Sequence, residues 1–215
     1  MLSRTAQAVI AAEILLSLGV GIGVGVWQDV QERIVFNQLK QSRPEPSPIV
    51  KIEKRVASPP LPATLARAIT VSAKLPEEQE KKAREGIHEM VDALKKQPNL
   101  YSHWLELGIL RKFIGDYQGA EEIWKYTTLT WPNEAVSFSN LANLYKSELS
   151  DLTKAEQYTL LAIEKAPYLF NYYYDAYELY RFVLKDDAKA RDILLKGKER
   201  NPGDAESYTA FLSKF

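Results

Sequence analysis

Hydrophobic positions along the chain follow two different patterns. Residues 6–27 are apolar at nearly every position and contain only three polar residues. From Pro76 to the C-terminus, apolar residues instead recur at spacings of three and four, which is the spacing of one face of an α-helix. Between these regions, residues 44–76 hold seven of the eleven prolines. The pattern predicts an apolar helix, an extended connector and an all-α domain.

Residues 1–27 are predicted to form an N-terminal transmembrane anchor, because about 20 helical residues cross a bilayer core. Four glycines at alternate positions form two overlapping pairs at a spacing that lets membrane helices approach closely: Gly19, Gly21, Gly23 and Gly25. Glu13 is an ionisable residue within the span, where it either takes part in helix packing or lies near one face, protonated or snorkelling. We expect either a plain anchor or a helix that packs against another one, including a second copy in a homodimer.

This anchor predicts a single-pass membrane protein. Arg4 precedes the span, whereas Arg33, Lys40 and Arg43 follow it among acidic residues. Counting cations slightly favours a cytoplasmic C-terminal domain. A short tail with one arginine before a single span equally resembles a bacterial signal anchor, and on that basis we expect the domain to be extracytoplasmic.

Residues 28–75 are predicted to be a polar helix followed by a basic, proline-rich linker. Residues 40–74 contain seven basic and two acidic residues. Proline fixes φ and removes a hydrogen-bond donor, so this stretch is expected to be a semi-stiff, solvated tether rather than a packed layer.

The C-terminal region repeats with a period of 34 or 35 residues. Each unit has a proline, with an aromatic residue six positions later: Pro98 and Trp104, Pro132 and Phe138, Pro167 and Tyr173, Pro202 and Tyr208. Aspartates and alanines keep the same period: Asp116, Asp151 and Asp186, then Ala120, Ala155 and Ala190. We interpret each unit as two helices, in which the aspartate caps the second helix and the alanine permits close packing. One such pair cannot bury its apolar face alone, so neighbouring pairs must stack.

These positions resemble the signature of the tetratricopeptide repeat (TPR) family. The first unit matches at Trp104, Leu107, Gly108, Ala120, Trp124 and Pro132; the second at Phe138, Leu141, Ala142, Tyr145, Ala155, Ala162 and Pro167; the third at Tyr173, Tyr180, Ala190 and Pro202, with departures at Tyr177 and Gly197. The resemblance implies an all-α, TPR-type solenoid of helical hairpins over residues 76–215. It would contain a leading helix, three helix pairs near 101–133, 135–168 and 170–203, and a C-terminal cap at 205–215. Trp104 and Trp124 should pack the first pair across Gly108 and Ala120.

The resemblance also implies a concave groove, lined by the first helix of each pair, that binds a protein or peptide segment. The candidate groove residues are Leu105, Ile109, Lys112, Asn140, Asn143, Lys146, Asn171, Tyr174, Glu178 and Arg181. Asparagine suits an extended backbone, because its amide both donates and accepts. Lys112, Lys146 and Arg181 recur with the repeat and favour an acidic segment or a terminal carboxylate, although each also complements a helix dipole. The carboxylate clamp of chaperone-binding family members is not reproduced.

Composition narrows the function further. Lys+Arg and Asp+Glu both number 28, so the total charge gives no reason to expect a nucleic-acid partner, and the aromatic stretch 168–182 is acidic on balance. The chain has no cysteine and two histidines, and we find no nucleophile–base pair, phosphate loop or metal cluster. We therefore expect no enzyme and no cofactor. The sequence predicts a membrane-anchored protein–protein interaction scaffold; the alternative is a structural subunit of a membrane or envelope assembly, packed through its glycine-rich helix.

Overall fold

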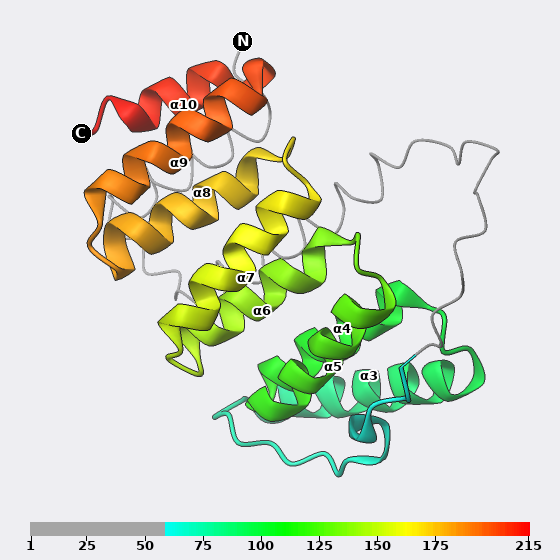
Figure 1. The fold of residues 1–215 in the computed structure, drawn as a ribbon. Helices are drawn as coiled ribbons and strands as arrows, with labels where there is room; N and C mark the ends of the chain where they lie inside the picture. The colour runs from blue at the N-terminus through cyan, green and yellow to red at the C-terminus, as the bar shows by residue number, and fades with distance from the viewer. Residues whose placement is uncertain (1–58) are drawn as a thin grey trace, which may run out of the picture. The chain divides into compact units, whose positions relative to one another are not determined.

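The computed structural model describes residues 59–215, and every regular element in this range is helical (Figure 1). The predicted anchor, including Glu13 and the glycines of residues 19–25, lies outside the described residues. Among residues 59–215, none of the helices combines the length and the apolar character that crossing a bilayer requires.

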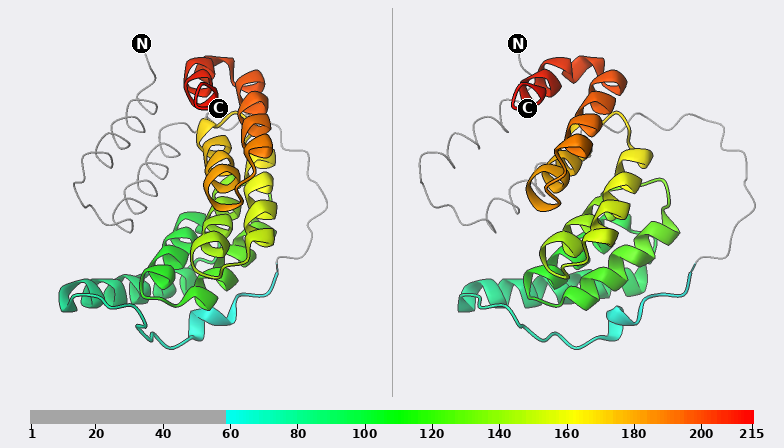
Figure 2. Two further views of the ribbon diagram at one scale, coloured as in Figure 1. Left: turned by 90° about the vertical axis from the view of Figure 1, so that its left-hand side faces the viewer. Right: turned by 60° about the vertical axis from the view of Figure 1, so that its left-hand side comes forward.

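Eight α-helices follow one another in the described residues: α3 (Glu77–Lys96), α4 (Tyr101–Phe113), α5 (Tyr117–Thr130), α6 (Ala135–Ser147), α7 (Leu152–Lys165), α8 (Phe170–Glu178), α9 (Asp187–Arg200) and α10 (Ala205–Leu212). Shorter elements are η1 (Ala63–Ala66), the π-helical turn η2 (Leu179–Val183) and η3 (Pro202–Asp204). Each α-helix packs against the one before it and the one after it. Figures 1 and 2 show α4–α5, α6–α7 and α8–α9 as successive hairpins, with α3 leading and α10 against α9. The predicted repeat of helical hairpins is therefore confirmed for the described residues.

Two features form the turn within each hairpin: a residue with positive φ and an aspartate that caps the second helix. One residue before the aspartate takes a positive φ, of 81°, 54° and 57° at Gly115, Ser150 and Lys185 respectively. This left-handed conformation ends the first helix. The next residue caps the second helix, because its carboxylate accepts the backbone N–H three residues later, at 3.0, 3.1 and 2.9 Å for Asp116, Asp151 and Asp186. The predicted aspartate caps are confirmed.

In two of the four units, a hydrogen bond joins the proline carbonyl to the aromatic residue six positions later. The indole N–H of Trp104 donates to the carbonyl of Pro98 at 2.8 Å. The hydroxyl of Tyr173 donates to the carbonyl of Pro167 at 3.1 Å. Each bond ties the first helix of a hairpin to the turn that precedes it.

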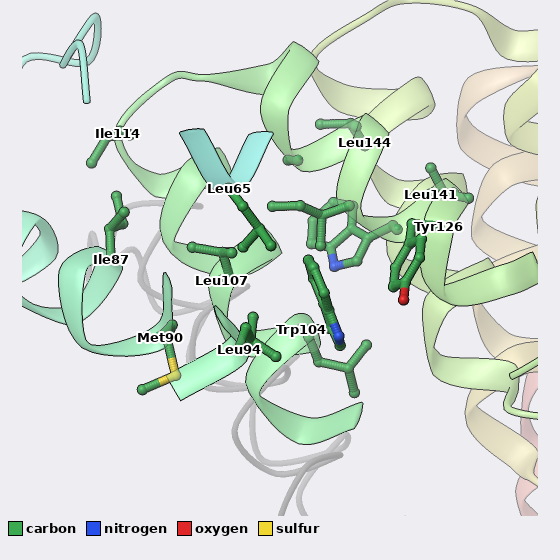
Figure 3. Packing of buried hydrophobic residues seen from close by; sticks show 14 of the residues in the cluster. Leu65, Ile87, Met90, Leu94, Trp104, Leu107, Ile114, Tyr126, Leu141 and Leu144 are labelled. Atoms are coloured by element: carbon green, nitrogen blue, oxygen red, sulfur yellow. The ribbon is translucent and has the colours of Figure 1, made fainter. Parts of the chain in front are cut away.

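The first hairpin closes around its two tryptophans. Trp104 and Trp124 are almost fully buried. A Cβ atom at Gly108 would lie 2.3 Å from the indole nitrogen of Trp124, so only glycine lets this side chain cross the first helix. The predicted packing of Trp124 over Gly108 is confirmed. Figure 3 shows Trp104 among aliphatic side chains that come from several helices and from η1.

Residues 62–73, which we call the strap, lie against the first hairpin. The buried Arg111 guanidinium donates to three strap carbonyls, those of Thr64, Arg67 and Ala68, at 3.0–3.2 Å. Leu65 inserts into the hydrophobic core (Figure 3). The backbone N–H of Ser72 donates to the carbonyl of Ile114 at 2.8 Å. The expectation of a solvated tether is wrong for the strap, because its backbone accepts hydrogen bonds from a buried cation and one of its side chains joins the core.

Candidate binding site between α6 and α8

A shallow cleft lies where α6, α7 and α8 meet, and we call it the α6–α8 cleft. Its lining residues are Ser139, Ala142, Asn143 and Lys146 from α6, Thr159 and Ala162 from α7, and Tyr172, Asp175 and Leu179 from α8 and the turn that continues it. The free volume is about 10 Å³, room for roughly one water molecule. A site of this size suits contact with side chains of a partner rather than enclosure of a small molecule.

Two polar groups of the cleft have no hydrogen-bond partner among the described residues. The hydroxyl of Tyr172 is buried and unpaired, although the residue is only 3% exposed. The half-buried carboxylate of Asp175 has neither a hydrogen bond nor an ion pair within residues 59–215. Buried polar groups in folded proteins are normally paired. The half-buried carboxylate of Asp175 can therefore meet an external partner, whereas the Tyr172 hydroxyl is enclosed.

Burial and neighbouring charges set the electrostatics of the cleft. Burial raises the pKa of Asp175 to about 7; Lys146 opposes this shift and Glu178 adds to it. Burial also raises the pKa of Tyr172, and the charge of Asp175 acts in the same direction. The Tyr172 hydroxyl stays protonated at neutral pH, so it can donate as well as accept.

The structure brings some predicted groove residues to the cleft. Asn143 and Lys146 line it directly, and Glu178 lies near enough to influence Asp175. Asn140 is buried, and its amide nitrogen has no hydrogen-bond partner among the described residues. Counted from the preceding proline, Asn140 is equivalent to Asp175 rather than to Tyr174. Ser139, which was not predicted, takes the position equivalent to Tyr174 and lines the cleft.

The predicted residues of the first hairpin lie elsewhere. Leu105 is 4% exposed and belongs to the hydrophobic core, so it presents almost no surface to a partner. Its assignment to an open groove is corrected on that ground. Ile109 is half-buried and packs against the same core, and Lys112 is half-buried near the end of α4.

The third hairpin uses its predicted residues largely for internal contacts. Arg181 lies 3.3 Å from the carboxylate of Asp187, donates to the backbone carbonyl of Lys214 and covers the ring of Phe215. Tyr174 is half-buried, with its ring centroid 5.0 Å from that of Phe211. Asn171 is half-buried. The cations Lys112, Lys146 and Arg181 therefore do not have equivalent surroundings, as a uniform cationic ladder would require.

Asp175, Tyr172 and Arg111 are the informative residues that sequence reasoning missed. A signal existed for two of them. Asp175 follows Asn140 by 35 residues, so it occupies the same place in the next hairpin. Arg111 stands where the later repeats have Tyr145 and Tyr180. No comparable pattern marked Tyr172.

Comparisons with known proteins add little to this geometry. No protein-family model matches the chain, and no curated protein matches it. A crystal structure of MamA aligns with 66% of this chain and 94% of its own, at 19% identity and a TM-score of 0.47. Within residues 59–215, no three His, Asp or Glu side chains are grouped to hold a metal ion. The function is therefore inferred from the residues of the chain itself.

Proposed function

We propose that the chain is a membrane-tethered protein-interaction scaffold, and that its α6–α8 cleft holds a segment of a partner protein. The observation that carries the proposal is the unpaired, half-buried carboxylate of Asp175 in the cleft. The buried hydroxyl of Tyr172 and the carboxylate of Asp175 have no partner within residues 59–215. Leaving a buried polar group unpaired costs about 1–3 kcal/mol, and a bound segment that donates to Asp175 would offset part of that cost.

The lining of the cleft suits a polypeptide segment. Asn143 can donate to and accept from an extended backbone. Ser139 and Thr159 are short and leave room for a main chain to approach. Because α6 and α8 belong to successive stacked hairpins, their side chains are held at fixed separations without help from the ligand. Such preorganisation lowers the entropic cost of binding.

The proposed tether is the apolar segment 6–27, which has the length of one membrane span. We propose that it places the repeats on the extracytoplasmic side of the membrane. Attachment to a surface raises the local concentration of the scaffold near membrane-bound partners without any new contact. The strap is bound to the first hairpin through Arg111, so residues 62–73 do not lengthen the tether. Only the linker residues before the strap would add to its reach.

Site-directed photo-cross-linking tests the proposal. A benzophenone amino acid at Ser139, in the cleft, should capture a protein in intact cells, and the adduct should sediment with membranes. The same probe at Arg191, an exposed residue of α9, is the matched control. Adducts that are absent from Ser139, or identical at the two positions, would contradict partner binding at the cleft. A soluble adduct would contradict the tether.

A further inference from the structure

The charge of the cleft identifies the chemistry of the partner, given the proposed function. We infer that the α6–α8 cleft binds an arginine or lysine side chain of the partner segment, and that the carboxylate of Asp175 is the counter-ion. The sequence alone favoured an acidic segment, because three cations recur with the repeat. The structure places different charges around the site.

The lining holds one carboxylate and one cation, and two further carboxylates act on lining residues from nearby. Asp175 lines it, and the charge of Glu178 acts on Asp175. Glu134 also contributes to the negative field at Tyr172. Lys146 is the one cation among the lining residues. The next cation of the repeat, Arg181, is occupied by Asp187 and by the C-terminal residues. Since low-dielectric walls focus the field of the carboxylates, a cationic group is attracted and an acidic one is repelled.

Asp175 is suited to be the counter-ion of an external cation. No donor among residues 59–215 satisfies its carboxylate, and Lys146 acts on it through charge without an ion pair. A partly desolvated carboxylate gains most from a charged donor, because charge-assisted hydrogen bonds are about twice as strong as neutral ones. An ammonium or guanidinium would therefore stabilise the ionised form that burial disfavours.

A further acceptor beside Asp175 favours arginine over lysine. Asn143, whose amide oxygen is an acceptor, belongs to the same lining as Asp175, whereas the Tyr172 hydroxyl is enclosed. A guanidinium has five N–H donors in a planar fork and can reach several acceptors at once, whereas an ammonium has three donors at one point. The free volume of the cleft holds about one water molecule, so a guanidinium would meet these acceptors at the opening of the cleft rather than inside it.

Selection from a display library of random dodecapeptides tests the inference on the immobilised full chain in detergent. Selected peptides should carry arginine or lysine at one recurrent position. Their affinity should fall about tenfold or more in Asp175→Asn, which removes the charge and keeps the shape. Asp192→Asn, an exposed carboxylate on α9 whose partner is Lys196, is the matched control and should leave affinity unchanged.

The outcomes separate this inference from the proposed function. Acidic or uncharged peptides that compete with cross-linking at Ser139 would overturn the inference and leave the scaffold function intact. Basic peptides whose affinity does not change in Asp175→Asn would overturn it as well. If no peptide binds the cleft, both proposals fail. A circular dichroism spectrum of Asp175→Asn that matches the wild type excludes misfolding as the cause of lost binding.

Discussion

The first hairpin and the two later ones differ at one equivalent buried position. Arg111 in α4 corresponds, by repeat spacing, to Tyr145 in α6 and to Tyr180 in the turn that continues α8. All three side chains are almost fully buried. The tyrosines face the preceding hairpin, since the hydroxyl of Tyr145 donates to Glu121 of α5. Arg111 instead faces the strap.

The difference shows that the residue at this position matches the hydrogen-bond acceptors offered by the element that packs against it from the N-terminal side. Glu156 of α7 is equivalent to Glu121 and, after burial, is the main cause that raises the pKa of Tyr180. Counting back from Pro98 places Ile87 of α3 at the same position, and this fully buried side chain offers no acceptor. Thus the leading helix cannot satisfy a tyrosine as α5 and α7 do. The strap supplies carbonyl acceptors in its place, and arginine has the donors to use them.

Replacing Arg111 with the tyrosine of the later hairpins is the substitution with the largest expected effect. Arg111→Tyr should lower the free energy of unfolding by about 3–5 kcal/mol, because it leaves Asp116 and the strap carbonyls without their buried cation. Urea unfolding of the full chain, followed by circular dichroism, measures the loss. The matched control is Arg191→Tyr, at an exposed position, where we expect a change within about 0.5 kcal/mol. A loss below about 1 kcal/mol in Arg111→Tyr would show that the strap is not held by this cation.

Periodicity made the hairpins predictable from the sequence, and its exceptions account for what was missed. Pro98 and Trp104, with their equivalents, mark each unit because the aromatic residue is buried in every unit. In two units a hydrogen bond to the proline carbonyl also fixes the spacing. The strap has no periodic signal. It is held mainly through its backbone carbonyls, which every residue possesses, so only the unusual arginine at 111 indicated that something covers this position.

The binding site was less predictable than the fold because exposure depends on neighbouring hairpins. Asn143 and Lys146 were identified from repeat position alone. Leu105 has an equivalent position to Ser139, yet one side chain is core and the other lines the cleft. Asp175 resembles an ordinary helical surface residue in the sequence, and its burial follows from the packing of α8 against α7.

Asp175 in the cleft contrasts with Arg111 in the first hairpin, because the carboxylate has no partner among residues 59–215 and the cation has several. The pKa of Asp175 is about 7 in the folded chain, against about 3.9 for an aspartate in an unfolded one. Because the folded pKa is raised, the folded state holds the proton more tightly. The stabilising contribution of this group is fully present below about pH 4 and is lost as the pH rises through 7.

Replacing this carboxylate with an amide should therefore stabilise the chain at high pH. Asp175→Asn should raise the free energy of unfolding at pH 8 by on the order of 2 kcal/mol, allowing for the partial exposure of the side chain. At pH 4.5 the two proteins should differ little. Urea unfolding at both pH values measures this, with Asp92→Asn, on the exposed surface of α3, as the control. The same difference at both pH values would mean that titration of Asp175 is not its cause. Lys146 and Glu178 are the neighbouring charges whose own variants should shift the midpoint in opposite directions.

The left-handed turn residues allow a closely matched comparison of the first two hairpins, with the smallest expected effect. Gly115 and Ser150 occupy equivalent left-handed positions, with φ of 81° and 54°. A Cβ atom at Gly115 would lie 3.0 Å from the backbone nitrogen of Ala73 and 3.2 Å from the Cβ of Ser72, both in the strap. Ser150 is exposed and has no strap beside it.

Reciprocal substitutions at these two turns should have opposite signs. Gly115→Ser should lower the free energy of unfolding by about 1 kcal/mol, because it adds left-handed strain and crowds the strap. Ser150→Gly should raise it by about 0.5 kcal/mol, since relief of the same strain exceeds the entropy cost of glycine. Thermal unfolding of the two variants beside the wild type measures both. Equal and opposite changes would mean that only the backbone conformation matters, whereas a larger loss at Gly115 is what contact with the strap requires.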